Sequence, residues 1–184
     1  MADFRKIILE YYSHSPELLK TLWIHSECVA RKAISCLDRR GIEADRDFVY
    51  EAAMLHDIGI IRCDAPGIHC HGTEPYIRHG VIGSEMLKSK NLPRHALVCE
   101  RHTGAGISRE EIIDAGLPLP HRDMLPVSVE EQVICYADKF FSKSRRLDEE
   151  KPVEKILLQM AAHGQDSAAR FAMLHSRFGD QDPH

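Results

Sequence analysis

The chain has 184 residues, 43% hydrophobic and 28% charged, a composition typical of one globular domain with a sizeable core. A net charge of −4 argues against a nucleic-acid polymer as the partner. The six cysteines include no C-x-x-C pair and lie mostly in apolar helical patterns, so we expect reduced thiols in a cytoplasmic protein. No apolar run approaches the roughly 18 residues of a membrane span, so we expect no membrane partner.

Apolar residues in the first part of the chain recur at helical spacing. Ser15 and Pro16 are typical of a helix start, and Gly41 is typical of a helix end. A stretch with proline and glycine breakers follows further on, over residues 60–74, and is long enough to be a functional loop. The helices predicted here cover about residues 3–12, 16–40 and 47–58.

The second part of the chain is also helical in pattern. Ser108 and Glu111 form a capping box for a short helix, and residues 116–127, with three prolines, predict a surface excursion. The longer helices predicted here cover about residues 75–89, 94–102, 129–146 and 152–178. Because no stretch favours a strand and no internal repeat occurs, we predict an all-α fold. We expect one domain over residues 1–184, with its core at about 20–145.

Four residues dominate the functional interpretation: His25, the adjacent pair His56-Asp57, and Asp138. Histidine and aspartate are the ligands that hold a divalent metal and leave room for a water. The pair lies in an apolar stretch, AAMLHDIGII, where burying both groups is costly unless something satisfies them. Adjacent helical residues project about 100° apart, so both can reach one metal only near a helix end. We expect Gly59 to supply that end.

This order of residues resembles the HD-domain superfamily of metal-dependent phosphohydrolases. The resemblance rests on LHDIG, on His25 placed 31 residues before His56, and on the later segment YADKF. It implies a helical HD bundle with His25, His56, Asp57 and Asp138 as the primary metal site. It also implies hydrolysis of a phosphate ester or anhydride by a metal-activated water, with Asp57 as a catalytic residue.

Two further histidines look like the additional ligands of two-metal members. His79 lies in IRHGVIGSEML and His102 in ERHTGAG. The resemblance implies that they bind a second metal, with Asp57 bridging the two. Iron or manganese is expected first, and zinc, nickel or magnesium fit the donors as well. The plainer alternatives are a helix-surface residue for His79 and a helix C-terminal histidine for His102.

Positive residues beside these ligands are candidates for binding phosphate. They are Lys139, also a candidate catalytic residue, and Arg78 and Arg101, each directly before a histidine. The alternative for each is a solvated surface charge. The histidine spacing and the HTG turn are similar to small stand-alone HD hydrolases, including those that cleave dinucleoside polyphosphates symmetrically. We therefore expect a small phosphorylated substrate, a nucleotide, and a homo-oligomer is compatible with the sequence.

Other functions stay open at this point. Cyclic-dinucleotide phosphodiesterases are disfavoured, because Ile60 and Ile61 follow HDIG where those enzymes carry a lysine. A di-iron oxygenase of the HD type and a non-catalytic nucleotide-binding HD module would use the same ligands. A structural zinc in the 60–74 loop is a further alternative, with four candidate ligands: Cys63, His69, Cys70 and His71.

Overall fold

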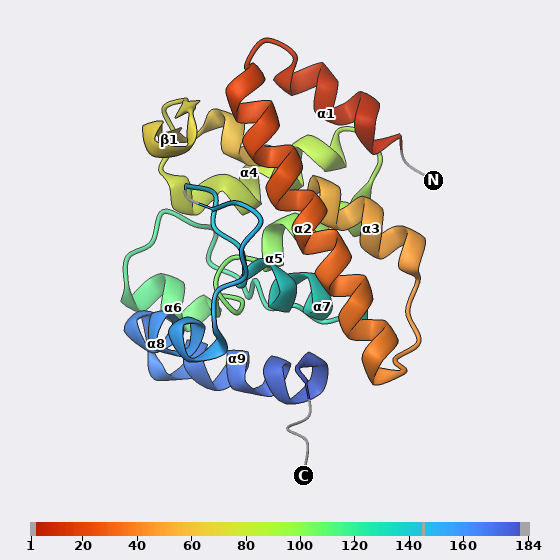
Figure 1. Ribbon diagram of the computed structural model, residues 1–184. Helices are drawn as coiled ribbons and strands as arrows, with labels where there is room; N and C mark the ends of the chain where they lie inside the picture. Colours follow the sequence, from red (N-terminus) through yellow and green to blue (C-terminus); the bar gives the residue numbers. More distant parts are fainter. Residues whose placement is uncertain (1–2, 145, 181–184) are drawn as a thin grey trace.

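The structure is a computed structural model that describes residues 3–144 and 146–180 (Figure 1). Within these ranges helices dominate, and the only sheet is one antiparallel pair of two-residue strands, so the predicted all-α class is confirmed. The α-helices are α1 (Phe4–Tyr12), α2 (Pro16–Arg40), α3 (Arg46–Leu55), α4 (His79–Lys88), α5 (Pro93–Arg101), α6 (Arg109–Asp114), α7 (Val129–Asp138), α8 (Val153–His163) and α9 (Gln165–Phe178). The 3-10 helices are η1 (Ile58–Arg62), η2 (Pro66–Ile68) and η3 (Tyr76–Arg78), and the strands are β1 (Asp64–Ala65) and β2 (Cys70–His71).

The helix ends follow local side-chain chemistry. Asp45 and Ser128 each accept a hydrogen bond from the backbone three residues on, which caps α3 and α7. Ser108 and Glu111 form the predicted capping box at α6. Gly41 ends α2 as predicted, in the left-handed conformation with φ of 62°, which glycine adopts at little cost.

Several predicted helix boundaries were wrong. The third helix stops at Leu55, before His56, and Gly59 lies inside η1. The helix predicted from residue 75 begins only at His79, after the 3-10 turn η3. The helix predicted over 152–178 is split at Gly164, whose φ of 133° cannot belong to a helix.

The helix predicted over 129–146 was also too long, since α7 ends at Asp138. The chain turns there and buries Phe140, whose ring packs against Tyr136 at 5.0 Å and Phe171 at 6.5 Å between centroids. Residue 145 lies outside the described residues. The segment between α7 and α8 then crosses the front of the molecule toward the β1–β2 turn (Figure 1).

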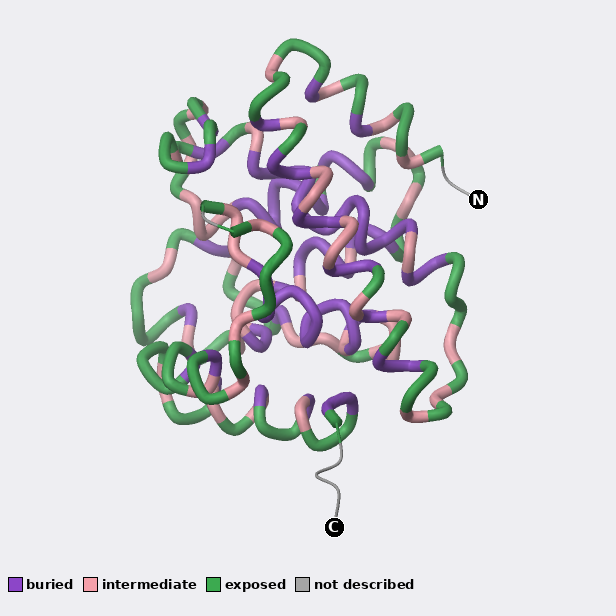
Figure 2. Tube along the Cα trace, viewed as in Figure 1, coloured by how far each residue is buried: buried purple, intermediate pink, exposed green. Residues whose placement is uncertain are grey.

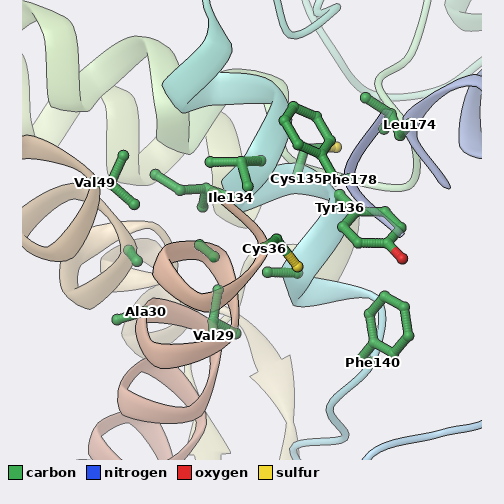
Figure 3. Close-up of a cluster of buried hydrophobic side chains, with 14 of the residues drawn as sticks. Val29, Ala30, Cys36, Val49, Ile134, Cys135, Tyr136, Phe140, Leu174 and Phe178 are labelled. Atoms are coloured by element: carbon green, nitrogen blue, oxygen red, sulfur yellow. The ribbon is translucent and has the colours of Figure 1, made fainter. Parts of the chain in front are cut away.

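Two large apolar clusters form the core. Figure 2 shows the buried residues gathered on the inner sides of the helices. In the first, α7 packs between α2 and α3 on one side and α9 on the other, as Val29, Ile134, Tyr136 and Phe178 show (Figure 3). The second joins α1, α4 and α5 to the other part of α2, the end of α3 and η1. Because α2 and α3 contribute to both, polar residues on their facing sides lie at the junction of the two clusters. Within the described ranges, no helix is both long and apolar enough to cross a bilayer.

Candidate metal centre

Six predicted site residues converge at the junction of the two apolar clusters. All six are buried, with exposures between 0% and 7%. His25 lies within α2, His56 and Asp57 directly follow α3, and Asp138 is the last residue of α7. The remaining two lie at helix ends, where His79 begins α4 and His102 caps α5. The prediction that His56 and Asp57 meet beyond a helix end holds, although Leu55 rather than Gly59 is that end.

The first cluster consists of His25, His56, Asp57 and Asp138, which offer ligand atoms within 4.8 Å of one another. The Nε2 atom of His25 lies 3.0 Å from Asp138 Oδ1 and 3.3 Å from Asp57 Oδ2. The Nε2 atom of His56 lies 3.1 Å from Asp57 Oδ2 and 3.4 Å from Asp138 Oδ1. Two imidazoles and two carboxylates therefore face one small volume.

The second cluster consists of Asp57, His79 and His102. Asp57 Oδ1 lies 3.5 Å from His79 Nε2 and 3.3 Å from His102 Nε2. The Oδ2 atom of the same carboxylate faces the first cluster. Asp57 is thus shared, with one oxygen directed to each pair of histidines.

Three histidines form hydrogen bonds through Nδ1, which direct their Nε2 atoms into the two clusters. Nδ1 of His56, His79 and His102 lies 2.6 to 2.8 Å from the carbonyl oxygen three residues earlier. A carbonyl only accepts, so each Nδ1 carries a proton, and each ring in its neutral form presents an Nε2 lone pair. This is the tautomer that a metal ligand needs.

Several buried polar atoms of these clusters lie close to one another without forming hydrogen bonds. His56 Nε2 and both oxygens of Asp57 are buried and have no aligned hydrogen-bond partner among the described residues. The Nε2 atoms of His79 and His102 face each other at 3.0 Å. Two neutral rings with protonated Nδ1 cannot bond through these atoms, whereas a cation can accept both lone pairs. The residues present therefore fit divalent metal ions.

Comparison with known proteins agrees with this geometry. The family model of the HD domain matches residues 22–142, about two thirds of the chain. The chain belongs to the HD domain family. The resemblance inferred from the sequence is thereby confirmed. No solved structure matches the chain.

Three curated relatives are similar to part of the chain. An uncharacterized protein of Methanocaldococcus jannaschii is 36% identical over 65% of the chain and 63% of its own length. Two relatives are named tRNA (cytidine(56)-2'-O)-methyltransferase. The protein of Picrophilus torridus is 34% identical over 82% of the chain and 39% of its own length. The protein of Thermoplasma volcanium is 32% identical over 72% of the chain and 35% of its own length. The chain spans less than two thirds of each of these relatives.

Charge is distributed unevenly over this HD domain site. Burial would raise the pKa of Asp57, but His56 and Lys143 hold it well below its usual range. Burial would lower the pKa of His56, yet the carboxylates of Asp57 and Asp138 raise it to about 9. Burial lowers the pKa of His79 to about 3 despite the carboxylate of Asp57. The first cluster thus attracts positive charge, and the second presents neutral ligands.

Glycines allow the helices of the second cluster to approach the HD motif. A Cβ atom at Gly59 would lie 2.1 Å from the carbonyl oxygen of His79 and 2.5 Å from the backbone nitrogen of Gly83. A Cβ atom at Gly80 would lie 2.5 Å from the carbonyl oxygen of Cys99. The glycine of HDIG therefore brings α4 against η1, and Gly80 brings α4 against α5, which places the two histidines together.

Two lysines face the carboxylates, and only one of them was a sequence candidate. The ammonium group of Lys139 lies 2.7 Å from Asp138 Oδ2 and donates to the carbonyl of His102 at 2.9 Å. Lys143 was missed; its ammonium lies 2.7 Å from Asp57 Oδ2 and 3.8 Å from Asp138 Oδ1. The available signal was a second lysine five residues after Asp138, in YADKFFSK.

The two candidate arginines are directed elsewhere. Arg78 pairs with Glu74 at 3.0 Å, and Arg101 pairs with Glu131 at 2.9 Å. The alternative zinc site in the 60–74 loop does not assemble either. Among the described residues only the two clusters above group three or more potential ligands, and in that loop the histidines are exposed while the cysteines are buried.

Proposed function

We propose that this protein is a metal-dependent phosphohydrolase that cleaves a phosphate ester or anhydride of a small substrate, a nucleotide by class. The observation that carries the proposal is the shared carboxylate of Asp57, whose two oxygens face two separate sets of histidine Nε2 atoms. This arrangement suits two divalent ions held side by side. The family supports the same chemistry, because HD domains are generally hydrolases.

The donor set divides naturally between two ions. His25, His56, Asp57 and Asp138 would hold one, and Asp57, His79 and His102 would hold the other. When bound, such ions supply positive charge against a phosphate group and lower the pKa of a coordinated water. Iron or manganese is our first expectation, since imidazole and carboxylate donors suit both.

The side chains around the donors keep them in place. Lys139 joins Asp138 to the backbone at His102, so one ammonium group ties the first cluster to the second. These two contacts make Lys139 a positioning residue, and phosphate contact by Lys139 stays a prediction. The three Nδ1 hydrogen bonds fix the ring orientations, which is the usual role of such outer partners.

The methyltransferase name of two relatives describes whole proteins, of which the match covers 39% and 35%. Buried imidazoles and carboxylates at the positions described here are donors for metal ions rather than groups for methyl transfer. We therefore base the proposal on the site and not on that name.

The test is phosphate release by purified protein reconstituted in turn with manganese, iron, zinc, nickel and magnesium. The substrates are nucleoside monophosphates, nucleoside triphosphates and symmetrical dinucleoside polyphosphates. Chelation should abolish turnover and added metal should restore it. Oxygen consumption by the iron-loaded protein without phosphate release would identify an oxygenase instead, and nucleotide binding without turnover would identify a binding module.

A further inference from the structure

A cavity adjoins the metal centre on the side of Lys143. Its volume is about 330 Å³, near the lower end for small-molecule sites. The residues that line it are Ala65, Gly67, Ile68, Tyr76, Lys143 and Ser144. They come from three segments, which are the β1–η2 turn, η3 and the segment that follows α7 (Figure 1).

Two walls of this cavity touch the donor clusters directly. The ammonium of Lys143 lies 2.7 Å from Asp57 Oδ2. The ring of Tyr76 stacks on the ring of His79, with centroids 4.7 Å apart and planes 27° from parallel. A molecule in the cavity would therefore contact Lys143 and Tyr76, which touch Asp57 of both clusters and His79 of the second.

Lys143 differs from Lys139 in ways that matter for binding an anion. Lys139 has two partners within 3 Å, and its side chain is 9% exposed. Lys143 has one close partner, lines the cavity and is 15% exposed. A lysine ammonium has three donors on a flexible four-carbon stem, so Lys143 can donate a hydrogen bond to a phosphate oxygen in the cavity.

The other walls suit one compact organic group. Ala65, Ile68 and the ring of Tyr76 are apolar surfaces, and Gly67 offers bare backbone. A volume of about 330 Å³ matches a single group of nucleoside size.

We propose that Lys143 binds the substrate phosphate and that this cavity holds the organic part of a phosphomonoester with one group of nucleoside size. The inference rests on the proposed phosphohydrolase function and narrows its substrate class. It favours a nucleoside monophosphate over a dinucleoside polyphosphate, whose second nucleoside would lie outside the cavity and gain no contact with its walls.

Two substitutions separate the phosphate from the organic group. Lys143→Met removes the ammonium, and Lys143→Arg keeps a positive charge. Gly67→Phe fills the cavity, and it should not disturb the fold because a Cβ atom at Gly67 meets nothing within 4 Å. Lys88→Met, at an exposed lysine, is the matched control.

The measurements are calorimetric binding of inorganic phosphate at saturating manganese, metal content, melting temperature and kinetics with a nucleoside monophosphate. Lys143→Met should weaken phosphate binding by about ten- to a hundredfold, as loss of a charge-assisted hydrogen bond does, with metal content unchanged. Lys143→Arg should restore most of the binding. Gly67→Phe should leave phosphate binding intact and raise KM for the monophosphate.

Unchanged phosphate affinity in Lys143→Met, with only a lower melting temperature, would show that Lys143 merely neutralises Asp57 and would overturn the inference. A higher kcat/KM for a dinucleoside polyphosphate than for the monophosphate would overturn the substrate class. Loss of phosphate binding in Lys143→Met, in a protein that hydrolyses no ester, would support the anion site and refute the phosphohydrolase function.

Discussion

The two clusters that share Asp57 are built by different means. The first draws its ligands from α2, the end of α3 and the end of α7, which are held by the large apolar clusters of the core. The second takes His79 and His102 from the ends of two short helices that meet through glycine contacts. The first should therefore be as robust as the core itself. The second depends on a few close backbone contacts and should be the easier one to remove alone.

The largest effect should come from Asp57→Ala, because this residue serves both clusters. We expect metal content to fall from about two ions per chain to near zero. Turnover should fall by more than about a hundredfold, since loss of an outer partner alone costs up to that much. Elemental analysis and phosphate release measure the two effects. Asp114→Ala, at an exposed aspartate, is the control, and retention of one ion in Asp57→Ala would contradict the shared role.

The next effect should be selective for the second cluster. His79→Ala together with His102→Ala should reduce metal content from about two to about one per chain, while the first cluster keeps its ion. Turnover should slow strongly. His121→Ala, at an exposed histidine, controls for the loss of a histidine elsewhere. Full metal content and full rate in the double variant would mean a mononuclear site with two ordinary helix-end histidines.

The sequence predicted the convergence of His25, His56, Asp57 and Asp138 because burying such residues in apolar helices needs a specific reason. It misjudged Gly59, which was expected to end a helix. Gly59 instead lets the backbone of α4 approach η1 so closely that a Cβ atom at this position would clash with it. Such a contact joins segments distant in sequence, so local patterns carry no sign of it.

Lys143 was missed for a related reason. In a helix continuing to residue 146, it would project about 140° away from Asp138. The chain leaves the helix at Asp138, and Lys143 returns to the carboxylates. Arg78 and Arg101 were proposed from adjacency to histidines, but neighbouring residues on a helix point in different directions, and each arginine has a glutamate partner.

A smaller effect should follow from tightening the glycine contact of the second cluster. In Gly80→Ala, the added Cβ would lie 2.5 Å from the carbonyl oxygen of Cys99 and 3.2 Å from Thr103 Oγ1. Overpacking of this kind costs about 1–3 kcal/mol of unfolding free energy, partly offset by about 1 kcal/mol of helix propensity. Urea denaturation measures the net loss, and metal titration should show weaker binding of one ion only. Gly67→Ala, where nothing lies within 4 Å, should leave both unchanged.

The smallest effect concerns an outer support of the second cluster. Arg170 on α9 donates to the carbonyls of Ala105 and Gly106, in the turn after His102, and pairs with Glu111 at 2.8 Å. Burial raises the pKa of Glu111, but hydrogen bonds from Ser108 and Arg170 outweigh it and lower the pKa below the usual 4.5.

A carboxyl group whose pKa is lowered by folding stabilises the fold at pH values above its usual pKa. This stabilisation is lost as the pH falls through the lowered pKa. Glu111→Gln should therefore be less stable than the parent near neutral pH, by up to about 1 kcal/mol, because the pair is partly exposed. The difference should shrink as the pH falls below 4.5. Urea denaturation at several pH values measures it. A difference that stays constant with pH would mean that Arg170 holds the turn through its backbone contacts alone, so that the second cluster has no electrostatic support from α9.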